Sequence, residues 1–96
     1  MRTIEQTSQF KRDLKREALG SHRQTLKSTF AAIVAAFAND QPLADRNHDH
    51  VLAGDWKKHR ECHVKPDLLL IYQKLDTSDG SLLRLTRLGS HSELFG

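Results

Sequence analysis

Residues 63–72 have the sequence HVKPDLLLIY. Pro66 and Asp67 favour a tight turn, because proline fixes φ and aspartate can bond its own backbone. The five apolar residues 68–72 then run without a break, which is typical of a central strand covered on both faces. This stretch therefore predicts a turn followed by a strand in the middle of a sheet.

Further strands are predicted on both sides of this stretch. Residues 56–64 precede it as a strand, residues 76–80 form the next turn, and residues 82–88 form a third strand that Gly89 ends. A short polar and apolar tail, 91–95, follows. The short links between these strands make them antiparallel neighbours.

The N-terminal half has helical spacing instead. Phe10, Leu14 and Ala18 share one face of a helix that Ser8 can cap and that Gly20 can end in a left-handed conformation.

A second helix is predicted after a possible capping box at Ser21 and Gln24, and residues 39–42 end it before a polar loop at 43–49. Its apolar residues recur at steps of three and four: Leu26, Phe30, Ile33, Val34 and Phe37. Residues 2–6 form a short strand that adds to the sheet. The order indicates one α+β domain, residues 1–96, with a small antiparallel sheet packed against two helices.

The composition indicates the kind of partner and the cellular compartment to expect. The 96 residues carry a formal charge of +3, with a pI near 9.3, which favours anionic partners. Cys62 is the only cysteine, so neither an intrachain disulfide nor a four-thiolate zinc site can form. The first nine residues contain no apolar run that could serve as a signal peptide or a membrane span. We therefore expect a cytoplasmic protein.

A charged strand face is the most informative local pattern. Lys57, His59, Glu61 and His63 are two residues apart, so on a strand they share one face, which is either solvated or a site. The opposite face holds Trp56, Cys62 and Val64 and is expected to be buried, with Lys58 and Arg60 reaching its rim.

Histidine, present six times, is the unusual residue of this chain. On a strand, His59 and His63 would lie about 13 Å apart, too far to share a zinc ion. A cross-strand zinc site using His50 and His63 stays open, but we expect no metal and no cofactor.

Histidines also suit RNA cleavage without a metal, which needs a base for the 2'-hydroxyl, a cation for the phosphate and an acid for the departing 5'-oxygen. Asp67 could act as base or hold a histidine, although an aspartate after proline commonly only closes a turn. Arg87 could bind phosphate and Phe95 could stack on a base, although a terminal aromatic more often packs on its own domain.

The order of these residues is itself specific. It runs through Asp49, His50, Leu52, Gly54, Trp56, Arg60, His63, Val64, Pro66, Asp67, Leu70, Ile71 and Tyr72, and ends in Arg87, Gly89, His91, Leu94, Phe95 and Gly96. In this order the chain resembles the YafQ branch of the RelE/ParE toxin superfamily, closely over 50–72 and 87–96 and loosely over the helices.

This resemblance implies a RelE-like fold and a ribosome-dependent mRNA endonuclease, the toxin of a type II toxin–antitoxin pair, which cuts message in the ribosomal A site. It implies that the catalytic group is His50, His63, Asp67 and His91, and that the substrate is bound by Glu61, Arg87, Phe95 and Lys57. Glu61 departs from the family pattern, because an aspartate is expected there; its carboxylate either orients a histidine or contacts the substrate. His48 has no such role and is expected to be solvated.

The resemblance also implies partners: a cognate antitoxin of DinJ-like or RelB-like type, and the ribosome with its mRNA and rRNA. Operator DNA would be bound only indirectly, through the antitoxin, and no membrane is involved. Two alternatives stay open: a non-enzymatic ParE-like inhibitor of a protein such as gyrase, and an inactive corepressor that only binds antitoxin.

Overall fold

The computed structural model describes residues 2–20, 26–43, 47–52, 54–56, 58–78 and 80–95, with only the backbone of Asp55. Within these residues the sheet has five strands in the order β1-β5-β4-β3-β2. The predicted α+β class, with a strand, two helices and a C-terminal meander, is confirmed. Lys57, Gly96 and the predicted capping box at Ser21 and Gln24 lie outside the described residues.

The meander is antiparallel, as expected. β3 (Arg60–Lys65), β4 (Leu68–Thr77) and β5 (Gly80–Gly89) pair in sequence order, with the predicted turn at Pro66 and Asp67 between the first two. The turn predicted at 76–80 is shorter, because β4 runs to Thr77 and β5 starts at Gly80.

The sheet as a whole is mixed, which corrects the antiparallel sheet predicted above. β1 (Thr3–Gln6) pairs with β5 in parallel, from Thr3 beside Leu82 to Gln6 beside Leu85. The chain between these strands forms the helices and the rest of the sheet, so no short hairpin forces them to run in opposite directions.

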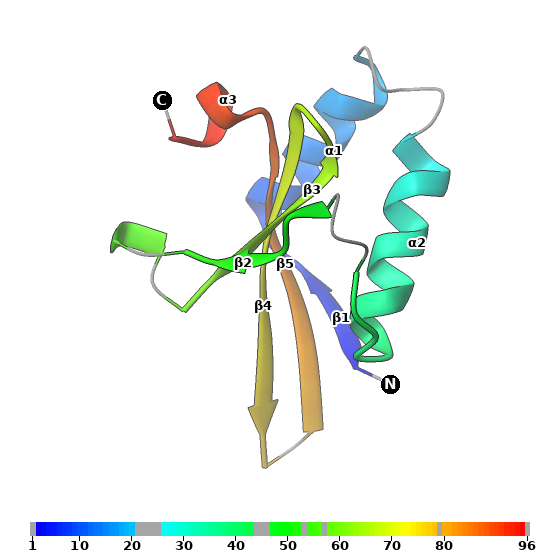
Figure 1. Ribbon diagram of the computed structural model, residues 1–96, viewed down its shortest axis with the longest axis vertical. Helices are drawn as coiled ribbons and strands as arrows, with labels where there is room; N and C mark the ends of the chain where they lie inside the picture. Colours follow the sequence, from blue (N-terminus) through cyan, green and yellow to red (C-terminus); the bar gives the residue numbers. More distant parts are fainter. Residues whose placement is uncertain are drawn as a thin grey trace.

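One face of the sheet is covered by α1 (Ser8–Ala18) and α2 (Leu26–Ala38), which Figure 1 shows together on one side of the strands. Phe10, Ile33 and Phe37 pack there against the even-numbered side chains of β3 and β4, and Cys62, Val64, Leu70 and Tyr72 are buried. The N-cap of α1 is Thr7, one residue before the predicted Ser8, because the Thr7 hydroxyl accepts from the Phe10 N–H. Ala18 is exposed, and Gly20 is not left-handed.

The opposite face is smaller and is covered by α3 (His91–Phe95) and by the segment around the 3-10 helix η2 (Gly54–Trp56). Leu69 and Ile71 of β4 are buried beneath Leu94, Phe95, Leu52 and Trp56. The central strand is therefore covered on both faces, as its unbroken apolar run predicted. The C-terminal tail is a helical turn rather than an irregular end.

The strand predicted at 56–64 starts late. Trp56 lies in η2, Lys58 has a φ of 73°, and β3 begins only at Arg60. His59 is thus not on the strand face with Glu61 and His63, and its ring packs 5.4 Å from that of Trp56 instead. β2 (His50–Val51), which pairs antiparallel with β3, was not predicted.

Candidate active site

The site is built on two rows of residues that cross the sheet on the α3 side. His50, Glu61, Ile71 and Arg87 are register partners across β2, β3, β4 and β5. In the next row His63 pairs with Leu69, and Leu69 pairs with Gly89, just before α3. Because neighbouring strands lie about 4.8 Å apart, roughly 10 Å of sheet separates Glu61 from Arg87.

Glu61 lies between two predicted catalytic histidines. The Nε2 atoms of His50 and His63 are each 3.7 Å from Glu61 Oε1, and Glu61 itself is only 5% exposed. A buried carboxylate is costly without partners, so these two rings are the groups that can compensate it when protonated. The predicted face of β3 is confirmed for Glu61 and His63.

The other nitrogen of His50 is also fixed. Its Nδ1 lies 2.6 Å from the His48 carbonyl oxygen, so Nδ1 donates and Nε2 faces Glu61. The His48 ring, although exposed as expected, meets the His63 ring edge on at 5.1 Å. Asn47 Nδ2 donates to the His63 carbonyl oxygen at 2.7 Å. The segment before β2 therefore holds both histidines.

This segment is anchored from the helix side by Asp49. The Asp49 Oδ1 accepts from the Tyr72 hydroxyl and, at 3.3 Å, from Arg60 Nε. Burial raises the pKa of Tyr72 above its usual value, and the hydrogen bond to Asp49 adds to this. Tyr72 thus remains a neutral donor, and Arg60 lies at the rim as predicted.

His91 and Phe95 are positioned by α3. Ser90 caps this helix: its Oγ accepts from the Glu93 N–H at 3.2 Å, while Glu93 Oε1 accepts from the Ser90 N–H at 2.8 Å. This is a capping box, and the S-x-x-E spacing at 90–93 would have revealed it. The His91 and Phe95 rings lie 5.0 Å apart, and Phe95 meets Trp56 edge on at 6.4 Å.

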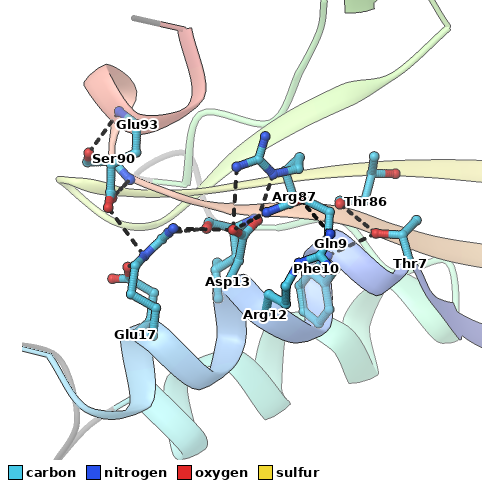
Figure 2. A network of polar contacts seen from close by, with 12 residues as sticks. Thr7, Gln9, Phe10, Arg12, Asp13, Glu17, Thr86, Arg87, Ser90 and Glu93 are labelled. Atoms are coloured by element: carbon cyan, nitrogen blue, oxygen red, sulfur yellow. Dashed lines mark hydrogen bonds and ion pairs between the residues drawn. The ribbon is translucent and has the colours of Figure 1, made fainter.

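A second missed feature is the buried Asp13 of α1, shown in Figure 2 pointing at Arg87. Arg87 Nε donates to Asp13 Oδ2 at 2.7 Å, and the Leu88 N–H donates to the same oxygen at 3.0 Å. Burial opposes ionisation of Asp13, but these bonds outweigh it and hold its pKa below the usual value. A polar residue three positions after Phe10, on the buried helix stripe, was the signal for this role.

The structure thus divides the predicted residues into separate groups. His50, Glu61 and His63 form one group, and His91 and Phe95 form another with Trp56 over β4. Arg87 lies in the Glu61 row, and Asp67 is exposed in the turn that follows β3. The part of the chain that the structure describes contains no cluster of three metal-binding side chains.

Comparison with known proteins decides the family. Residues 2–96 match the model of the bacterial toxin YafQ of type II toxin–antitoxin systems. The chain belongs to the YafQ toxin family. The YafQ-like toxin predicted from the sequence is therefore confirmed.

Individual relatives match this chain over nearly their whole length. The mRNA interferase toxin YafQ of Escherichia coli K12 is 38% identical over 99% of this chain and 97% of its own. The crystal structure of YafQ from Escherichia coli BL21(DE3) is 35% identical over the full length of both chains, with a TM-score of 0.81. A metal-bound toxin from Helicobacter pylori is 46% identical over 99% of this chain and all of its own, with a TM-score of 0.85.

Within the described residues of this YafQ-family toxin, no helix is both long and apolar enough to cross a membrane.

Proposed function

We propose that the chain is a ribosome-dependent mRNA endonuclease that cleaves message in the ribosomal A site without a metal. The observation that carries this is the pair of imidazoles that share the buried Glu61 carboxylate on a partly exposed sheet face. The name mRNA interferase, carried by the Escherichia coli relatives, supports the same reaction.

The chemistry divides among the groups of the site. A base, drawn from His50, His63 and Asp67, removes the 2'-hydroxyl proton, and the 2'-oxygen attacks the adjacent phosphorus. The bond to the 5'-oxygen breaks, and an acid such as His91 protonates that oxygen. The products are a 2',3'-cyclic phosphate and a 5'-hydroxyl. Arg87 stabilises the extra charge on phosphate, while Phe95 and Lys57 contact the substrate.

Glu61 has an orienting role in this scheme. It lies beneath the histidine rings and is nearly buried, so it contacts the rings more readily than RNA. Of the two roles that the sequence left open for Glu61, we therefore assign it the positioning of His50 and His63.

The proposed partners follow from the family. A solved structure shows the relative YafQ of Escherichia coli in complex with DinJ, so we assign this chain a DinJ-like or RelB-like antitoxin. An antitoxin would cover the basic site and exclude RNA. Its other partners would be the ribosome with bound message in the cytoplasm, and operator DNA through the antitoxin alone.

A cleavage assay tests the proposal. The purified chain is added to magnesium-containing ribosomes programmed with a short end-labelled mRNA, and the ends of the products are identified. We expect a 5'-hydroxyl and a cyclic or 3'-phosphate, no loss of cleavage with a zinc- and copper-selective chelator, and loss with His63→Gln. Loss of cleavage with the chelator and recovery with added metal would overturn the metal-free mechanism.

The same variant separates the alternatives. A ParE-like inhibitor of gyrase would keep its toxicity in cells when His63 is replaced by glutamine. A corepressor without activity would be non-toxic already as the native chain. Toxicity that His63→Gln abolishes, together with cleaved message, is the result we expect.

A further inference from the structure

Side chains of α1 bond backbone groups at an unpaired edge of β5, in addition to covering the sheet. β1 pairs with β5 only from Leu82 to Leu85, so within the described residues the edge of β5 that faces away from β4 has no partner strand beyond this point. Asp13 accepts the Leu88 N–H at 3.0 Å, and Arg16 Nη2 donates to the Leu88 carbonyl oxygen at 2.8 Å. Side chains of α1 therefore replace a strand at this edge, next to Arg87.

Both carboxylate oxygens of Asp13 contact one edge of the Arg87 guanidinium, the edge formed by Nε and Nη2. Its Oδ2 accepts from Arg87 Nε at 2.7 Å and its Oδ1 faces Arg87 Nη2 at 3.4 Å (Figure 2). Two contacts between a planar carboxylate and a planar guanidinium fix the direction of the whole group. Within the described residues, nothing bonds Nη1, so this nitrogen is left for a ligand.

Asp13 is itself rigidly held, which makes it able to orient a partner. It is 1% exposed, and Gln9 Nε2 and Arg16 Nη1 each donate to its Oδ1 at 3.3 Å. The Arg87 side chain, in contrast, is 22% exposed and so is partly open to solvent. A rigid buried acid behind a partly exposed arginine is the arrangement that presents a guanidinium in one orientation.

We propose that Asp13 is a positioning residue for cleavage, because it aims Arg87 Nη1 at the scissile phosphate. This rests on the proposed nuclease function. Asp13 fixes the orientation of the Arg87 guanidinium, but its negative charge also cancels the positive charge that Arg87 brings to the site. Its loss should therefore lower the rate of the chemical step without weakening the binding of anionic RNA.

A fall in kcat without a rise in KM distinguishes a positioning role from a merely structural one. Asp13→Asn keeps the shape and one acceptor for Leu88 N–H but loses the charge and the second acceptor. We expect kcat to fall by about tenfold or more, while KM for programmed ribosomes stays level or falls. The matched control is Glu5→Gln, which removes the carboxylate 2.6 Å from Arg84 on the same strand and should change neither constant.

A double-variant cycle tests whether Asp13 acts through Arg87. If it does, Asp13→Asn combined with Arg87→Gln should be no slower than Arg87→Gln alone. Multiplied losses, or an Asp13→Asn variant with native kcat, would overturn the proposal. If Asp13→Asn fails to fold, Arg87→Lys replaces it: lysine keeps the charge but lacks the oriented fork, and native kcat in this variant would overturn the proposal.

An NMR measurement tests the orientation without any cleavage. The Arg87 Nε–H signal of the free chain should show slow exchange with water in the native and Glu5→Gln proteins and fast exchange in Asp13→Asn. Equal exchange in all three would overturn the proposal. Slow exchange in a chain that cuts no RNA would instead show that Asp13 does hold Arg87 and that the nuclease function, and with it the role in cleavage, is wrong.

Discussion

Gly89 lies where α1, β5 and α3 meet, and replacing it by alanine should loosen that junction. A Cβ at this position would lie 2.8 Å from Arg16 Nη2 and 3.3 Å from both Glu93 Oε1 and Leu94 Cδ2. Such approaches are shorter than van der Waals contact, so Arg16 must move away from the Leu88 carbonyl oxygen, which Nη2 reaches at 2.8 Å.

The cost follows from what Arg16 loses. One charge-assisted hydrogen bond contributes about 1.5–3 kcal/mol, and the 41% exposure of the Arg16 side chain reduces this. The smaller backbone entropy of unfolded alanine offsets about 0.5–1 kcal/mol. We therefore expect Gly89→Ala to lower the free energy of unfolding by about 0.5–1.5 kcal/mol.

Urea denaturation followed by Trp56 fluorescence measures this change, because Trp56 packs against Phe95 of α3. Gly20→Ala is the control, since a Cβ there would come no closer than 3.6 Å to its neighbours, so this variant should show only the entropy gain and be more stable by about 0.5–1 kcal/mol. In an Arg16→Ala background the effect of Gly89→Ala should shrink. Equal stability of Gly89→Ala and the native chain would refute this account of the junction.

Three further predictions concern the buried polar groups. Tyr72→Phe should lower the free energy of unfolding by about 1.5–3 kcal/mol in urea, because Asp49 loses its hydroxyl donor. Folding lowers the pKa of Asp13, so the stability that ionised Asp13 contributes is full above the ordinary carboxyl pKa and is lost as pH falls through the lowered value. In Asp13→Asn the free energy of unfolding should therefore change less between pH 7 and pH 3 than in the native chain. Glu61→Gln should slow single-turnover cleavage at least tenfold by releasing His50, whereas Glu61→Asp should retain much of the rate.

The central strand and the second helix could be predicted because each has a simple local signature. The run 68–72 is apolar on both faces, and the structure buries all of it. Residues 26–38 repeat their apolar positions at helical spacing and form a helix of that extent. In both cases the pattern of burial is carried by the segment itself.

The remaining features depend on partners distant in sequence. Trp56 and His59 suggested an early start to β3, but Lys58 adopts a positive φ that alternation cannot indicate. The role of Asp13 could not be predicted, because it depends on the unpaired edge of β5, which is 75 residues away in the sequence and lies beside it only in the fold. His48 had no pattern of its own, and its role comes from the turn that brings it to His63.

The proposed nuclease function makes His50, His63, Asp67 and His91 responsible for cutting ribosome-bound message. Mapping the 5' ends of mRNA after brief expression of the native chain, His63→Gln and His91→Gln tests it most directly. We expect cuts locked to the reading frame in the native sample and none in either variant. Identical cuts in all three samples, or a toxic native chain without any frame-locked cut, would contradict it.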